Sequence, residues 1–473
     1  MNKIYYYLKY RTILILSGLM VFVSCAKEYP KNVDSPYETV LKSIKILNAG
    51  ANGNTVIEGV IDENRKTVSF PRIDLATNFD AIRFQAEMSD GAVLDKENYQ
   101  FVFGEGDAAK TNVVKVVNND RFREYLVTLR LNIPVFGADF GKPEIHDNSI
   151  NSIGNPIYPT FTSALTRGSG FDGEHVLIVT RHAMGSHLLK VSDLEQDNTT
   201  AIPLNLTGVA GGTFPVCAGA QVNGHTYVTN LSGNSAASPL KIYHWTNPNA
   251  EPQLIWADMI PGGGGRLGDN MSANLDANGN GYFYFGSNPS GFMGRLKVTN
   301  YTTVSDPLGF AASMPLGYNT SVNRVGSTSD YVYTGYEGPL RLSTDAGSIT
   351  YSLTNTAVPV RGSDAHIITF NGERYLIMIT AARTGSEPVV LYVYDITRGS
   401  TTKEALELFD ARSDKSPVYQ YSLNGTATPN CFTQVQWHVK KDAQGKDDKL
   451  MIYAAHTDAG FVLVEFGKKV QTD

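Results

Sequence analysis

The chain has 473 residues, of which 42% are hydrophobic and 18% charged, and its formal net charge at pH 7 is −6. This composition is typical of a globular protein with a substantial core, and the negative balance argues against nucleic acid as a partner, because binding a polyanion requires a concentrated basic surface. The 44 glycines, 25 tyrosines and 21 phenylalanines favour an all-β fold with many turns.

The first 25 residues have the pattern of an export signal. Basic residues precede an apolar stretch over 13–23, which is too short to span a hydrocarbon core of about 30 Å. The following Ser24-Cys25 resembles a bacterial lipobox, in which Cys25 is lipidated and becomes the mature N-terminus. The alternative is a cleaved secretory peptide with a coincidental cysteine. We therefore expect a lipid-anchored outer-membrane protein that faces the cell exterior, with residues 26–40 as a polar tether.

A first β unit is predicted over residues 41–132. Its last strand alternates cleanly, with Tyr125, Val127, Leu129 and Leu131 on one face. About seven short strands within roughly ninety residues are typical of an Ig-like β-sandwich. The strand candidates are Ser43–Leu47, Thr55–Ile61, Thr67–Phe70, Ala81–Met88, Tyr99–Val102, Asn112–Val117 and Glu124–Leu131.

The order of four segments in this unit carries a resemblance to a known group of proteins. They are Ser43–Ile46 (Ser-Ile-Lys-Ile), Val68–Leu75 (Val-Ser-Phe-Pro-Arg-Ile-Asp-Leu), Phe84–Val93 (Phe-Gln-Ala-Glu-Met-Ser-Asp-Gly-Ala-Val) and Arg123–Leu129 (Arg-Glu-Tyr-Leu-Val-Thr-Leu). The order resembles the Ig-like N-terminal modules of Bacteroidetes surface lipoproteins of unknown function, in which the module commonly acts as a spacer. Residues 26–28 resemble the surface-export tag of such lipoproteins.

The C-terminal part is similar to the repeat domains that follow such modules in lipoproteins of polysaccharide-utilisation systems. The resemblance implies a glycan as ligand and neighbouring surface lipoproteins or a transporter as further partners. The motifs that carry this resemblance are structural, so the resemblance identifies no catalytic residue in this chain.

Within 161–473 a pair of β-rich runs recurs six times. The first runs begin at His175, His225, Tyr282, Tyr331, Arg374 and Lys449. Strand pairs that recur at roughly 40–50 residues are typical of propeller blades, each of which cannot bury both of its faces alone. We predict a six-bladed β-propeller. A seventh blade within 410–430, in the longest interval between copies, is the alternative.

Each predicted blade has four strands. The chain ends before it could supply the last blade with a fourth strand, so a segment of the turn-rich linker 133–160 is expected to fill that place and close the ring. Ala405–Phe409 is expected to be an outermost strand. Cys217 and Cys431 lie on separate blades in this interpretation, so two buried free thiols are expected. The innermost strands are predicted at Phe161–Leu165, Val216–Val222, Met271–Asp276, Ala365–Phe370 and Phe432–Val439.

One segment partly matches a calcium loop. Asp276, Asn278 and Asn280 fit the first half of the pattern, but Ser287 stands where a bidentate Glu is needed. The same place in other copies carries Asn-Gly or Asp-Gly hairpin turns, which explains the residues without a metal. A hairpin turn is therefore favoured over a calcium site, and no other metal or cofactor is predicted.

The expected binding site lies at one mouth of the propeller. The loops from the outermost to the next innermost strand, and from the second to the third strand, meet there and carry side chains that recognise hydroxyl groups. The alternative explanation is that Asn and Asp generally favour loops. That preference explains the asparagines in these loops, but it explains the arginines and histidines less well. The candidate ligand-binding residues are Arg181, His182, Arg266, Asp269, Asn270, Arg361, Asp364 and His366.

These observations predict non-catalytic capture of a glycan by the propeller mouth. One alternative is a polysaccharide hydrolase or lyase that uses Asp269, Asp364 or His366 as acid or base. Another is a protein-docking scaffold.

Overall fold

The computed structural model describes residues 36–104, 106–151, 156–263, 265–287, 291–311, 318–354, 356–359, 361–385 and 388–471. The chain is all-β apart from short helical segments, and it divides into two compact units between Pro134 and Val135. The predicted lipidation site Cys25 lies outside the described residues. Within the described ranges, no helix is long and apolar enough to cross a membrane.

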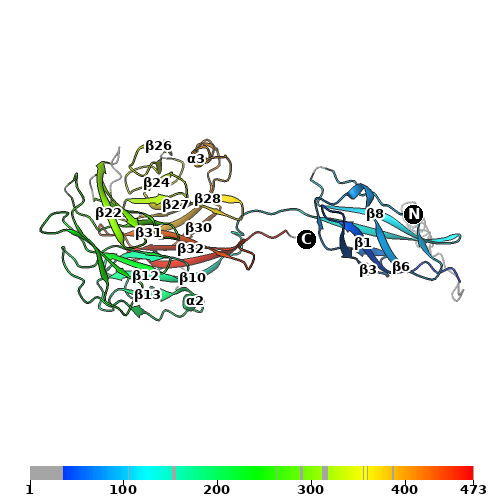
Figure 1. Ribbon diagram of the computed structural model, residues 1–473, viewed down its shortest axis with the longest axis horizontal. Helices are drawn as coiled ribbons and strands as arrows, with labels where there is room; N and C mark the ends of the chain where they lie inside the picture. Colours follow the sequence, from blue (N-terminus) through cyan, green and yellow to red (C-terminus); the bar gives the residue numbers. More distant parts are fainter. Residues whose placement is uncertain are drawn as a thin grey trace, which may run out of the picture. The chain divides into compact units, whose positions relative to one another are not determined.

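The first unit consists of two sheets around one core (Figure 1). One sheet has the order β2-β1-β6 and the other β3-β4-β9-β8-β7, with β5 also paired to β9. Tyr125, Val127 and Leu129 of β9 are completely buried, which is the face that the alternation of the sequence predicts. The elements are β1 (Leu41–Ala49), β2 (Thr55–Glu58), β3 (Val60–Asp62), β4 (Thr67–Ser69), β5 (Ile73–Asp74), the 3-10 helix η1 (Phe79–Ala81), β6 (Phe84–Met88), β7 (Val93–Leu94), β8 (Ala109–Asn118) and β9 (Arg121–Asn132).

The described part of the second unit contains six four-stranded antiparallel sheets, numbered here along the chain. In the first five, the strands follow one another in sequence. Sheet 1 is β11 (Thr166–Phe171), β12 (His175–Thr180), β13 (His187–Lys190) and β14 (Ile202–Pro203), with the short helix α2 (Val191–Leu194) after β13; sheet 2 is β15 (Gly219–Val222), β16 (His225–Thr229), β17 (Leu240–Trp245) and β18 (Gln253–Asp258); sheet 3 is β19 (Ser272–Leu275), β20 (Gly281–Gly286), β21 (Phe292–Thr299) and β22 (Thr303–Ala311).

The next two sheets repeat this order, and the last one combines strands from the two ends of the unit. Sheet 4 is β23 (Ser321–Arg324), β24 (Tyr331–Thr334), β25 (Arg341–Ser343) and β26 (Ile349–Ser352); sheet 5 is β27 (Gly362–Phe370), β28 (Glu373–Thr380), β29 (Val390–Asp395) and β30 (Tyr419–Ser422); sheet 6 is β31 (Thr433–Lys441), β32 (Asp447–His456), β33 (Gly460–Gly467) and β10 (Glu144–Ser149).

The strand β10 supplies the fourth strand of sheet 6. It runs antiparallel to β33, with Glu144 opposite Glu465 and Ser149 opposite Gly460 (Figure 1). This strand belongs to the second unit and to the linker 133–160 that was predicted to supply the fourth strand, and it pairs with β33.

The six sheets form a ring. The innermost strand of each sheet contacts that of the next, and β31 of sheet 6 contacts β11 of sheet 1. A separate hydrophobic cluster lies between each pair of neighbouring sheets, so each sheet buries both of its faces against its neighbours. Burial of both faces explains why whole strands are apolar rather than alternating, as in Val176–Val179 of β12.

Three predicted strands are wrong. Tyr99–Val102 is not a strand, because Tyr99 forms only an isolated β-bridge with Ile82 and the following residues are irregular. Phe161–Leu165 is a loop, and the innermost strand of sheet 1 is the following Thr166–Phe171, whose glycines obscured it. Ala405–Phe409 is helical, within α3 (Thr402–Asp410). Thr401 caps this helix by accepting the N–H of Glu404, and Glu404 in turn accepts the N–H of Ser400, so the local capping bonds favour a helix.

The fourth strand of sheet 5 is instead β30, which lies within the long insertion over 410–430. The described part of that insertion therefore completes sheet 5 and adds no further sheet. The prediction of two buried free thiols is confirmed for Cys217 and Cys431.

Candidate functional site

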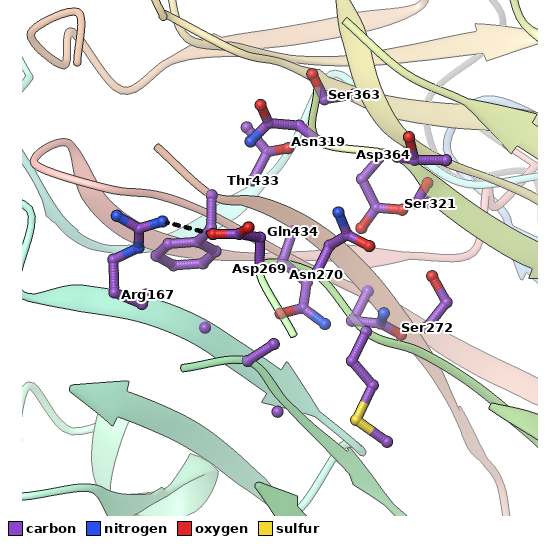
Figure 2. Close-up of a pocket in the computed structure, with 17 residues that line it drawn as sticks. Arg167, Asp269, Asn270, Ser272, Asn319, Ser321, Ser363, Asp364, Thr433 and Gln434 are labelled. Carbon is purple, nitrogen blue, oxygen red and sulfur yellow. Dashed lines mark hydrogen bonds and ion pairs between the residues drawn. The ribbon is translucent and has the colours of Figure 1, made fainter. Parts of the chain in front are cut away.

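The innermost strands surround a small polar cavity on the axis of the ring. Its volume is ≈ 30 Å³, which leaves room for about two water molecules and none for a sugar ring. All six sheets contribute through the innermost strands or the residues that lead into them (Figure 2). The polar residues that line it are Arg167, Asp269, Asn270, Ser272, Asn319, Thr320, Ser321, Ser363, Asp364, Thr433, Gln434 and Gln436.

Asp269 lies where the axial cavity meets the mouth, and it is held by two arginines. Its Oδ1 accepts a bond of 3.3 Å from Nη2 of Arg167, the contact marked in Figure 2, and its Oδ2 accepts a bond of 2.6 Å from Nε of Arg266. Arg167 is only 6% exposed, whereas the Arg266 side chain is 47% exposed. The carboxylate thus links a buried cation to one at the rim.

Asp364 and His366 of β27 are buried beside the axis. The two oxygens of Asp364 accept bonds from Asn323 Nδ2 at 2.7 Å and from the Val435 N–H at 2.9 Å. Burial raises the pKa of Asp364 and lowers the pKa of His366, so burial favours the neutral form of each group. Asn270 is also committed to the framework, because its Oδ1 accepts the Gly286 N–H at 2.8 Å.

A much larger pocket opens at one mouth of the ring. Its volume is ≈ 660 Å³, within the range of about 300–1,000 Å³ that is usual for ligand sites. It lies over sheets 1 and 2, and its walls come from loops that lead into innermost strands and from the loop after β12. The residues that line it are Ser163, Ala164, Leu165, Arg167, Thr180, Arg181, His182, Gly185, Leu206, Phe214, Pro215, Val216, Leu231, Arg266, Asp269 and Asn430.

Arg181 is fixed in this pocket by stacking and by two bonds. Its guanidinium carbon lies 3.5 Å from the centre of the Phe214 ring. Its Nε donates to the Val216 carbonyl at 3.3 Å and its Nη2 to the Cys217 sulfur at 3.1 Å. Burial lowers the pKa of Arg181, though not enough to discharge a guanidinium at neutral pH.

The pocket also contains a strained turn. Ser163 and Ala164 both have positive φ, 53° and 54°, and the Leu165 N–H bonds to the Thr162 carbonyl, as in a type I′ turn. Such turns usually require Asn or Gly, and strain of this kind accumulates at functional sites. Both oxygens of Asp458 accept the Ala164 N–H, at 2.9 and 3.0 Å, and this carboxylate holds the turn in place.

The structure therefore separates the predicted site residues into three places. Arg181, His182, Arg266 and Asp269 line the mouth pocket, whereas Asn270 and Asp364 line the axial cavity with Asp269. His366 is buried beside Asp364, its Nε2 4.0 Å from an Asp364 oxygen. Arg361 lies outside both cavities, 5.3 Å from the centre of the Tyr336 ring, with a φ of +80°.

The weak calcium pattern forms the turn between β19 and β20. Oδ1 of Asp276 accepts the N–H groups of Asn278 and Asn280, each at 2.9 Å, as the hairpin interpretation requires. Across the residues that the structure describes, no three His, Cys, Asp or Glu side chains are placed to hold a metal ion together.

Two site residues escaped the sequence analysis. Arg167 lies in the glycine-rich strand β11, for which no strand was predicted, and Phe214 stands alone in a loop. The signal for Arg167 was available, because glycines inside a β pattern often mark a close approach of two backbones.

These features define an all-β protein with a ring of six sheets and an arginine-lined pocket at one mouth. The chain belongs to the DUF4623 family, described as a domain of unknown function, whose profile matches residues 27–469. A DUF4623 family protein from Bacteroides eggerthii, known from its crystal structure, is 39% identical with a TM-score of 0.75, and the match covers 92% of this chain and 99% of that chain.

Other solved structures are similar at a greater distance. They include BamB from Moraxella catarrhalis, with 12% identity and a TM-score of 0.31 over 65% of this chain and 84% of that chain. An endo-arabinase from Bacteroides thetaiotaomicron has 13% identity and a TM-score of 0.32 over 66% of this chain and 97% of that chain. No curated protein matches the chain. Both distant likenesses are too weak to indicate an activity.

Proposed function

We propose that the protein is a surface lipoprotein that captures a glycan without cleaving it. In this proposal Cys25 carries the lipid anchor in the outer membrane, the first unit is an Ig-like spacer, and the ring of six sheets is a six-bladed β-propeller. Lipid and tether would keep the propeller near extracellular polymer and raise its effective concentration there. A neighbouring surface lipoprotein or a transporter would receive the glycan.

The mouth pocket is the observation that carries the proposal. It combines apolar walls with a few fixed polar groups, which is the usual composition of a small-molecule site. Phe214 is 39% exposed and offers part of a ring surface to a sugar, while Arg266 and His182 offer donors to hydroxyl groups. The axial cavity is too small for a sugar, so the ligand is assigned to the mouth.

The carboxylates favour capture over hydrolysis. A glycosidase commonly needs two carboxyl groups about 5–10 Å apart across the substrate. Among the described residues that line the mouth pocket, Asp269 is the single carboxylate, and two arginines hold it. Asp364 lies in the axial cavity with both oxygens occupied. This arrangement suits binding better than proton transfer.

Affinity electrophoresis through gels that contain plant and host polysaccharides tests the proposal, with release of reducing ends measured on the same polymers. We expect retardation by at least one polymer and no product. Phe214→Ala should weaken the retardation several-fold. The matched control is Phe122→Ala, because Phe122 of β9 is 62% exposed and also lies under a cation, with Lys115 Nζ 4.9 Å from its ring centre. Product formation would support the enzyme instead, and equal loss from both variants would place the site elsewhere.

A further inference from the structure

The mouth pocket carries an excess of positive charge in an acidic protein. Three arginines and one aspartate line it, which leaves a formal charge of +2, whereas the whole chain has −6. The carboxylate of Asp458 contacts the turn at this pocket, where both of its oxygens accept the Ala164 N–H. Low-dielectric walls concentrate the field of such a cluster inside a cleft. The pocket therefore selects anions.

Arg167 forms the floor of the pocket and is not fully satisfied by the protein. It is 6% exposed, and within the described residues its Nε has no hydrogen-bond partner although it is buried. In its ion pair with Asp269, the contacting atom of Arg167 is Nη2. A buried cationic donor without a protein acceptor is costly, so Arg167 keeps hydrogen-bonding capacity for a ligand group or a water at the floor.

Arg181 forms the wall above this floor, and it is positioned without an ion pair. Its side chain donates to a carbonyl and to a sulfur, and none of the described carboxylates pairs with it within 4 Å. Stacking on Phe214 fixes the plane of its guanidinium group. A guanidinium held in one plane is arranged for an oxyanion, because its donors match the two oxygens of a carboxylate.

We propose that the mouth pocket binds an acidic glycan, with the carboxylate of a uronic acid residue held between Arg167 and Arg181 and the rest of the sugar along the apolar walls. The inference rests on the proposed glycan capture and specifies its ligand class. A sulfated glycan presents a related anion, but a sulfate is tetrahedral and stands away from the ring. A carboxylate on the ring places the charge deep in the pocket and the ring beside Phe214.

Isothermal titration with three matched polymers tests the proposal. Polygalacturonate supplies the carboxylate, the same polymer with methyl-esterified carboxyl groups supplies the same chain without charge, and dextran sulfate supplies sulfate. We expect binding to polygalacturonate that weakens as salt rises, and binding to the esterified polymer weaker by about 10- to 100-fold, since a lost charge-assisted hydrogen bond has an effect of that size.

Variants locate the binding. Arg181→Met should weaken binding of polygalacturonate by the same factor, and Arg266→Met by less, because Arg266 lies at the rim. Arg167→Met leaves Asp269 with one partner and can unfold the protein, so Arg181→Met is the deciding variant. The control is Arg412→Met. Arg412 also lies over a phenylalanine, 5.7 Å from the Phe409 ring centre, and it donates to the Asp395 carbonyl. It belongs to the part of the chain that forms sheet 5 and does not line the mouth pocket.

The outcomes separate this inference from the proposed function. Equal binding of the charged and esterified polymers would overturn the acidic ligand and leave glycan capture standing. Preference for dextran sulfate over polygalacturonate would overturn the uronate assignment. Polygalacturonate binding that Arg181→Met and Arg412→Met reduce equally would overturn the pocket as the site. Binding of acidic peptides and of no polysaccharide would overturn both proposals.

Discussion

The close approach of sheets 1 and 2 makes Gly170 a position where alanine does not fit. Gly170 lies in β11, whose residues are all buried, beside β15 of the next sheet. A Cβ at this position would lie 2.4 Å from the Gln221 nitrogen and 2.9 Å from the Ala220 carbonyl carbon. Both are backbone atoms that cannot rotate away, so one strand must move by roughly 1 Å to restore an ordinary contact.

The magnitude follows from overpacking. Inserting a methyl group into a filled core costs about 1–3 kcal/mol, and backbone neighbours place Gly170→Ala at the upper end. The unfolding entropy of about 2.1 cal/mol/K per residue amounts to about 0.7 kcal/mol/K over a unit of roughly 340 residues, so 3 kcal/mol lowers Tm by about 4 °C. Ligand binding should weaken as well, because the displaced strand carries Arg167.

Gly467→Ala is the control. Gly467 ends β33, is exposed, and has no atom within 4 Å of the position that a Cβ would take. Calorimetry should show an unchanged or slightly raised Tm for this variant, because alanine restricts the unfolded chain. If Gly170→Ala melts within about 1 °C of the control, an overpacking cost of this size is absent, and the close packing of β11 on β15 is refuted.

Three further predictions address acid stability, the strained turn and the anchor. Burial lowers the pKa of His456 to about 4. The neutral imidazole therefore stabilises the folded state by about 3 kcal/mol above the unfolded pKa near 6.5, and this contribution is lost as pH falls toward 4. His456→Gln should flatten the pH dependence of the free energy of urea unfolding, and an unchanged pH dependence would contradict this prediction. Asp458→Ala should destabilise by about 1–2 kcal/mol, and adding Ala164→Gly should recover part of that loss in the same unfolding assay, because glycine accepts positive φ; no recovery would argue against strain in the turn. Cys25→Ala should move the protein from the membrane to the soluble fraction or leave it unprocessed, and retention in the membrane fraction would contradict lipidation.

The repeating sheets could be predicted from the sequence because each of them forms from apolar runs that are close together in the chain. Each sheet buries both faces against its neighbours, so the second and third strands are apolar runs such as Val176–Val179, and they recur along the chain at intervals of 43 to 75 residues. The linker 133–160 was predicted to supply the fourth strand of sheet 6, and β10 (Glu144–Ser149), which pairs with β33, lies within it.

The two wrong strands of the second unit have different physical causes. Thr166–Phe171 contains two glycines, which lower β propensity, and the reason for them is the neighbouring sheet rather than the strand itself. The apolar pattern of Ala405–Phe409 is compatible with a strand or a helix, and the capping bonds around Thr401 and Glu404 favour the helix. A Ser/Thr-x-x-Glu signature before an apolar run was the available signal.

The site was the hardest part to predict because its charges are arranged by the closure of the ring. Arg167 and Asp269 are 102 positions apart, yet they are in contact, and that contact removes Asp269 as a free acid. The sequence presents Asp269, Asp364 and His366 as comparable candidates, but burial on the axis commits the last two to the framework. What remains at the mouth is a set of arginines outnumbering their carboxylate partner. Ring closure therefore separates the polar residues into a committed set on the axis and an arginine-rich set at the mouth, and that partition, rather than any motif, supports the proposed anion site.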